Sequence, residues 1–124
     1  MRDMIRLAMI IADDNPERLR TALVTATAHV ALGGSASLFL QGSAVALLRS
    51  PIADPDAGRQ TAAGLPTLGQ LFLEALGLDV HFSACQSSLA LLDLTTDMFD
   101  SRVEWTGMIG FLSTIEPNDR LIMI

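Results

Sequence analysis

The segment HFSACQSSLALL, residues 81–92, contains Cys85, the one cysteine of this 124-residue chain. An apolar, strand-like run precedes the thiol and a helix-like run follows it. A thiol in the first turn of a helix lies near unpaired backbone N–H groups and the positive end of the helix dipole, which favour the thiolate. Because the thiolate attacks sulfur or carbon, Cys85 is the candidate catalytic residue. The alternative interpretation is an inert, buried cysteine.

Two neighbours of Cys85 are expected to set its position. Ser83 and Gln86 fit the capping-box pattern, with Ser83 as the N-cap and Gln86 at the third helical position. If the helix begins in this way, Cys85 lies in its first turn, where the pKa of the thiol falls below its usual value of about 8.5.

The two histidines do not form a catalytic pair with the thiol. His81 lies four residues upstream in an extended strand, roughly 13 Å from Cys85 at the usual rise per residue. His29 lies in the middle of a predicted helix, with no clear route to the thiol. Two isolated histidines and one cysteine also lack the spacing of metal ligands. We therefore expect neither a metal nor an organic cofactor.

Other polar or aromatic side chains are expected at the same sheet edge as Cys85. In open parallel sheets, ligands bind beyond the carboxyl ends of the strands. Asn15, Gln41 and Trp105 each follow or end a predicted strand. Together with Ser83 and Gln86, they form the predicted pocket around the thiol.

Charge excludes several classes of function. The formal net charge is −6 and the sequence pI is near 4.6, whereas nucleic-acid binding needs clustered cations. All eight basic residues are arginines. The chain therefore has no lysine for a Schiff base or for a phosphate-binding loop.

Cysteine content and hydropathy bear on location and assembly. A single cysteine cannot form an internal disulfide, so a reducing cytoplasm is expected. The apolar run that follows Arg2 and Arg6 is short and is closed by two aspartates, unlike a secretion signal. No stretch approaches the roughly 20 apolar residues that span a bilayer, so we expect no membrane partner. Half of the residues are hydrophobic but only 5% are aromatic, which indicates an aliphatic core and a face covered by self-association.

Strand-like and helix-like segments alternate along the chain. This alternation predicts one α/β domain over residues 1–124, with a mostly parallel five-stranded sheet that is covered on both sides. The expected strands are 5–11, 37–40, 78–83, 102–105 and 121–124. The expected helices begin after Asn15, at Gly42, at Pro66, at Ala84 and after Thr106.

Residues 50–64, SPIADPDAGRQTAAG, are the least regular segment. Two prolines, two aspartates and two glycines indicate an exposed loop. A loop of this length in a small domain is often a lid or a contact arm, and a tolerated surface excursion is the alternative.

Most of the chain resembles the DsrE/DsrF-like family, small α/β proteins that include sulfur-relay subunits. Three stretches carry the resemblance: VHFSACQSSLALL, VEWTGMIGFLSTI and the closing DRLIMI. LFLQGSAVALL is similar to the family's second strand and short helix. The resemblance implies a three-layer fold, assembly into trimers or hexamers, and a cysteine that carries sulfur as a persulfide. Only Cys85 matches that cysteine. Many relatives have a glycine after it, where this chain has Gln86.

Three functions remain open. The leading one is a cytoplasmic sulfur carrier, similar to sulfurtransferases, that accepts sulfane sulfur on Cys85 from a donor protein and passes it to an acceptor. The second is a non-catalytic oligomeric assembly module of the same fold. The third is a small-ligand binder that uses the cleft beside Trp105 and the 50–64 loop.

Overall fold

A sheet of five parallel strands forms the centre of the protein. The computed structural model describes residues 5–124, so Arg2 lies outside the described residues. The strands follow the order β4-β3-β2-β1-β5 and every neighbouring pair is parallel. They are β1 (Arg6–Ile11), β2 (Ser35–Leu40), β3 (His81–Cys85), β4 (Glu104–Thr106) and β5 (Arg120–Met123). The predicted α/β fold is confirmed, and the described sheet is parallel throughout.

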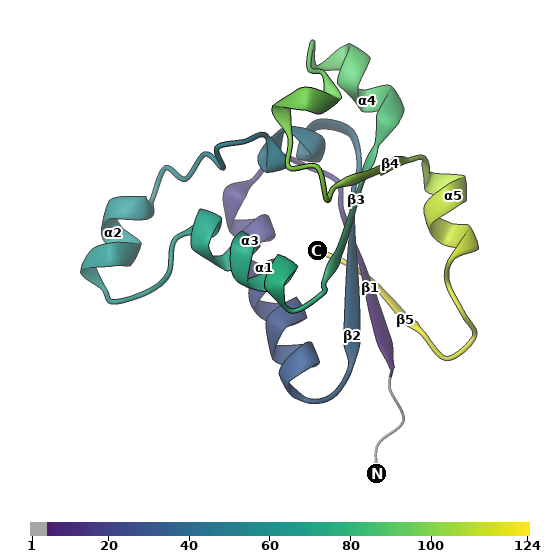
Figure 1. The fold of residues 1–124 in the computed structure, drawn as a ribbon, viewed down its shortest axis with the longest axis horizontal. Helices are drawn as coiled ribbons and strands as arrows, with labels where there is room; N and C mark the ends of the chain where they lie inside the picture. The colour runs from purple at the N-terminus through teal and green to yellow at the C-terminus, as the bar shows by residue number, and fades with distance from the viewer. Residues whose placement is uncertain (1–4) are drawn as a thin grey trace.

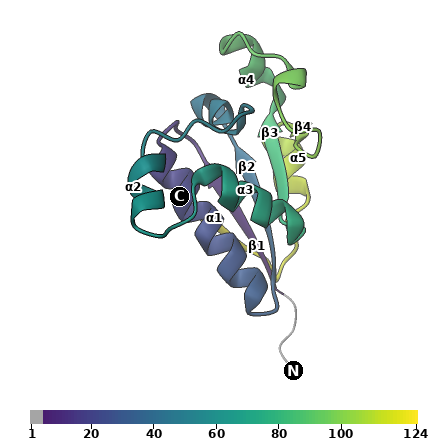
Figure 2. The same cartoon turned by 60° about the vertical axis from the view of Figure 1, so that its left-hand side comes forward.

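Helices cover both faces of this sheet, which gives the three expected layers. α1 (Pro16–Ala31) and α3 (Leu68–Gly77) lie side by side on one face, and α5 (Met108–Ser113) lies on the other (Figure 1). The view in Figure 2 shows the same separation. Each strand of a parallel sheet must return by a crossover, and right-handed crossovers set the face on which each helix packs.

Capping fixes where the two long helices begin. The Asn15 side chain accepts the N–H of Glu17 at 2.9 Å, so α1 begins at Pro16, as expected. α3 begins at Leu68, two residues after its predicted start at Pro66, because Thr67 caps it through a capping box with Gln70. Both helices bury an apolar face, since leucine, alanine and phenylalanine recur at helical spacing.

The predicted loop at residues 50–64 contains a further helix. It follows a 3-10 helix, η1 (Gly42–Leu48), and holds α2 (Ala57–Ala62), none of whose residues is buried. The Asp54 carboxylate ties this segment to α3, because it accepts the N–H of Asp56 at 3.3 Å and the N–H of Leu68 at 2.9 Å. The segment is therefore ordered, although it stands away from the core.

The third strand begins later than the sequence pattern indicates. Leu78 ends α3, and Asp79 adopts a left-handed φ of 62°, so the chain turns before it enters β3 at His81. The strand then extends to Cys85, where α4 (Gln86–Leu91) begins, followed by the 3-10 helix η2 (Thr96–Met98). This shift of the strand towards the C-terminus changes the setting of the thiol.

The core lies between the sheet and the helices, and one edge of the sheet is left uncovered. Phe39 of β2 stacks on Phe111 of α5 with ring centroids 4.9 Å apart. This contact packs α5 against its face of the sheet. All four residues of β5 are exposed. Within residues 5–124, no helix combines the length and apolar character needed to cross a bilayer.

Candidate functional site

Cys85 ends β3 at the carboxyl edge of the sheet and is 4% exposed. It pairs in register with Thr106 of β4, and the preceding Ala84 pairs with Trp105. The register of two parallel strands thus places the thiol beside the segment that follows β4. This is the edge at which open parallel sheets collect ligands.

The expected capping box around Cys85 is wrong. Ser83 lies inside β3, where its buried hydroxyl donates to the Leu38 carbonyl at 3.3 Å. Cys85 itself is the N-cap of α4, and Gln86 is the first helical residue. The reason is the pairing of Cys85 with Thr106, which keeps the backbone extended for two residues beyond Ser83.

Two serines of α4 surround the sulfur. The Sγ atom of Cys85 lies 3.2 Å from the hydroxyl oxygen of Ser87. Ser88 is buried, and its hydroxyl accepts the N–H of Gly42 at 3.1 Å, which leaves its own hydrogen free to donate. The backbone N–H groups of both serines face the sulfur without forming a well-aligned capping bond.

These neighbours decide the ionisation of the thiol. Burial raises the pKa of Cys85, since it disfavours the charged form. Hydrogen bonds from the Ser87 and Ser88 side chains, and from their backbone N–H groups, act in the opposite direction and together outweigh burial. The pKa of Cys85 therefore lies below its ordinary value, which favours the thiolate.

An open groove adjoins the thiol. Its volume is about 630 Å³, and it is lined by Gln86, Ser87, Trp105, Thr106 and Gly107. The Trp105 ring packs edge-on against Phe99 with centroids 4.8 Å apart. This contact holds the Trp105 side of the groove in position. Cys85 is not among the lining residues, whereas Ser87, whose hydroxyl lies 3.2 Å from the sulfur, is one of them.

The predicted pocket residues are only partly brought together. Gln86 and Trp105 share the groove beside the thiol, whereas Ser83 is buried within its strand. Gln41 follows β2, next to the Gly42–Ser88 hydrogen bond, and its buried side-chain oxygen has no hydrogen-bond partner among the described residues. Asn15 follows β1, which is two strands from β3 and so roughly 10 Å away, and its side chain caps α1.

The histidines lie away from the thiol. His81 starts β3, at the opposite end of the strand from Cys85, and its Nε2 lies 3.2 Å from the Glu104 carboxylate. The His29 ring is hydrogen-bonded to the Ile5 carbonyl at 2.8 Å. In the part of the chain that the structure describes, no three histidine, cysteine or acidic side chains gather as a metal site would require.

Four residues of the site were not anticipated from the sequence: Ser87, Ser88, Thr106 and Gly107. The two serines follow Cys85 by two and three residues, the positions whose N–H groups an N-cap side chain meets. Recognising Cys85 as the N-cap would have identified them. Thr106 and Gly107 come from the register of β4 against β3, which a single sequence does not determine.

Comparisons with known proteins place this site within a known fold. The model of the DsrE/DsrF-like family matches residues 6–124. The structure is similar to that of a protein of unknown function, MTH1491 from Methanobacterium thermoautotrophicum, with a TM-score of 0.74, 16% identity and coverage of 97% of this chain and 99% of that one. It is also similar to the ychN protein from E. coli, with a TM-score of 0.72, 12% identity and coverage of 98% and 100%. No protein with a curated description matches the sequence.

Proposed function

Because the chain belongs to the DsrE/DsrF-like family, which is associated with sulfur relay, we propose that it is a sulfur carrier that holds sulfane sulfur as a persulfide on Cys85. The observation that supports this most strongly is the thiol at the carboxyl edge of β3, with the Ser87 hydroxyl 3.2 Å from its sulfur. The same hydrogen bonds that lower the pKa of the thiol would stabilise Sγ as the leaving thiolate when the outer sulfur passes to an acceptor.

Loading and discharge are two exchanges at sulfur. The Cys85 thiolate attacks the outer sulfur of a donor persulfide, R–S–SH. A new S–S bond forms on Cys85, the donor S–S bond breaks, and the donor leaves as the thiolate R–S⁻ with the bonding electron pair. An acceptor thiolate then attacks the outer sulfur on Cys85, which leaves as a thiolate. Neither exchange needs an added oxidant or reductant.

The absence of a second cysteine in the sequence determines how sulfur leaves. No internal thiol can resolve the persulfide, so the acceptor must be another molecule. We propose donor and acceptor proteins that present their own thiols in the groove lined by Gln86, Ser87 and Trp105. The reducing cytoplasm, where thiols stay free, is the compartment in which such a relay works.

A donor or acceptor protein can react with Cys85 only after the sulfur atom becomes exposed. Cys85 is 4% exposed, and we propose that a rotation of the Ser87 side chain, whose hydroxyl lies 3.2 Å from the sulfur, uncovers it. Ser87 is itself exposed and lines the groove, so a rotamer change opens the route without moving β3. Such side-chain motions are fast compared with catalysis.

We also propose that the carrier assembles with copies of itself, as trimers or hexamers. On α5, Ile109 is 88% exposed and Leu112 is 44% exposed. On the neighbouring edge strand β5, Met123 is 68% exposed. An uncovered apolar edge strand is a site of pairing with another chain, and a second copy offers a matching apolar surface.

Sulfur loading tests the function. The purified chain is incubated with a protein or small-molecule persulfide, and its intact mass is measured before and after addition of a thiol acceptor. A gain of one sulfur atom that the acceptor removes, and that is absent in Cys85→Ser, is expected. A gain that persists in Cys85→Ser, or no gain at all, would remove the proposal.

A non-catalytic assembly module of the same fold is the second candidate. The low exposure of Cys85 and the apolar surface of α5 and β5 favour it. If the native thiol reacts more slowly than the denatured chain at every pH while the protein remains oligomeric, this candidate replaces the sulfur carrier.

A further inference from the structure

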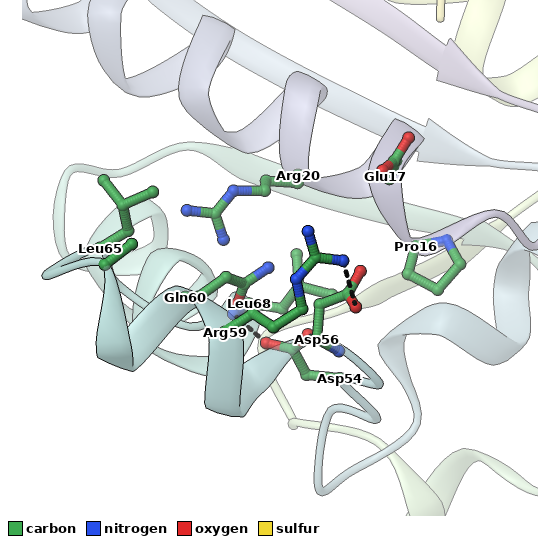
Figure 3. A pocket seen from close by; sticks show the side chains of 10 residues that line it. Pro16, Glu17, Arg20, Asp54, Asp56, Arg59, Gln60, Leu65 and Leu68 are labelled. Carbon is green, nitrogen blue, oxygen red and sulfur yellow. Dashed lines mark hydrogen bonds and ion pairs between the residues drawn. The ribbon is translucent and has the colours of Figure 1, made fainter.

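A second cavity lies on the outer side of the helix layer, apart from the thiol. It has a volume of about 320 Å³ and is enclosed by the first turns of α1, the segment around α2 and the start of α3 (Figure 3). It shares no lining residue with the groove beside Cys85. The volume falls at the lower end of the roughly 300–1,000 Å³ of small-molecule sites.

Three N–H donor groups converge in this cavity. Arg20 of α1 is fixed by a hydrogen bond from its Nη1 to the Pro66 carbonyl at 2.9 Å, so its other N–H groups are presented to the cavity. Arg59 of α2 reaches into the same space from the opposite wall, and the amide nitrogen of Gln60 points between the two guanidinium groups (Figure 3). The Gln60 oxygen is turned inward, buried and without a partner among the described residues, which leaves the donor end facing the cavity.

The rest of the lining restricts the ligand. The Asp56 carboxylate lies 3.9 Å from Arg59, and Glu17 also lines the cavity, with its carboxylate directed away from the three donors (Figure 3). A dianion such as phosphate would be repelled by these carboxylates, whereas an ammonium group would be attracted. Leu65 and Leu68 supply an apolar wall. The cavity therefore offers separate places for a carboxylate, an ammonium group and an aliphatic side chain.

We propose that this cavity binds a free amino acid with an aliphatic side chain. The carboxylate lies against Arg20 and the Gln60 amide, with Arg59 adding charge, because a guanidinium matches a carboxylate in geometry. The ammonium group lies toward Asp56, and the side chain packs on Leu65. This binding site is independent of the sulfur chemistry, because no residue is common to both sites.

Isothermal titration calorimetry with L-leucine tests the proposal. Leucinamide lacks the carboxylate and 4-methylpentanoate lacks the amine, so both are expected to bind at least about tenfold more weakly than leucine. Inorganic phosphate is expected not to compete. No binding of leucine, valine or methionine at millimolar concentration would overturn the proposal, as would equal binding of leucinamide.

Variants locate the binding in this cavity. Arg20→Met is expected to weaken leucine binding about tenfold or more. Arg18→Met is the matched control, since Arg18 lies on the same helix but pairs with Asp13. Gln60→Glu is a second test, and its thermal unfolding is measured alongside, because the Gln60 side-chain oxygen is buried. It places a carboxylate where the ligand carboxylate binds and is expected to abolish binding. Unchanged affinity in a folded Gln60→Glu protein would contradict the assignment.

Discussion

The Sγ atom of Cys85 lies 3.2 Å from the hydroxyl oxygen of Ser87, across the N-terminus of α4. Together with the buried hydroxyl of Ser88, this contact offsets the effect of burial and lowers the pKa of the thiol. The sequence run Cys-Gln-Ser-Ser thus contains both the thiol and the groups that lower its pKa.

Ser87→Ala is expected to raise the pKa of Cys85, because it removes a donor to the thiolate and leaves burial unopposed on that side. Thiolate absorbance in the ultraviolet, followed against pH, measures the shift. Ser101→Ala is the control, since Ser101 is exposed and lies in the turn before β4. A titration unchanged in Ser87→Ala would show that this hydroxyl does not stabilise the thiolate.

Gly110→Ala is expected to disturb the wall of the groove. A Cβ atom at Gly110 would overlap Oγ1 of Thr106, the residue paired with Cys85. Overpacking of this kind costs typically about 1–3 kcal/mol in the free energy of unfolding, although alanine is the better helix former. Urea denaturation measures the loss.

A double-mutant cycle separates this overlap from other effects of Gly110→Ala. In a Thr106→Ala background the overlapping oxygen is gone, so Gly110→Ala becomes neutral or stabilising by up to about 1 kcal/mol. Gly69→Ala in α3 is the control, because its surroundings are open. Equal losses in both backgrounds would show that the contact with Thr106 is not the cause.

Asp100 and Arg102 hold the turn that leads into β4. Hydrogen bonds from the Arg102 side chain and backbone lower the pKa of Asp100 to about 2, from 3.8. Since the pKa is depressed in the folded state, this carboxylate stabilises the fold above pH 3.8, and the contribution is lost as the pH falls toward 2. Carboxyl NMR titration should report the low pKa.

Arg102→Gln is expected to move the pKa of Asp100 back toward 3.8. The free energy of unfolding of this variant should therefore fall less steeply as the pH decreases from 3.8 toward 2. Asp97→Asn is the control for a neighbouring carboxylate with no contact to Arg102 among the described residues. An Asp100 carboxyl that titrates at its ordinary pKa in the wild-type chain would contradict the geometry of the turn.

Two residues of α5 separate folding from assembly. Phe111 is 4% exposed and stacks on Phe39, so Phe111→Ala is expected to cost about 3–5 kcal/mol in the free energy of unfolding. Ile109 is 88% exposed, and Ile109→Arg is expected to leave the fold intact while it dissociates the proposed oligomer. Light scattering coupled to size-exclusion chromatography measures the mass. A wild-type monomer at micromolar concentration would remove the assembly proposal.

The fold class could be predicted from the sequence, because it depends on the alternation of local strand and helix patterns. The apolar run of β1 and the Asn15–Pro16 start of α1 are short-range signals, and both lie where they were expected. The position of Cys85 depended instead on strand pairing. Ser83 and Cys85 are both able to cap a helix, and the contact of Cys85 with Thr106 of β4 decides between them.

The remaining features arise from contacts between distant segments. α2 is short and has no buried face, so its residues carry no helical pattern, and the proline-rich flanks indicated a loop. The cavity between Arg20 and Gln60 depends on how that segment folds against α1. Asn15, predicted to lie near Cys85, follows a strand separated from β3 by β2, because strand order is not encoded in any one segment.

The rate of Cys85 alkylation as a function of pH is the most direct measurement of whether this thiol is ionised and reachable. We expect a midpoint below the value of about 8.5 for a free cysteine, and at neutral pH a faster reaction than that of the denatured chain. A native rate equal to or slower than the denatured rate, with a midpoint at or above the free value, would contradict the account.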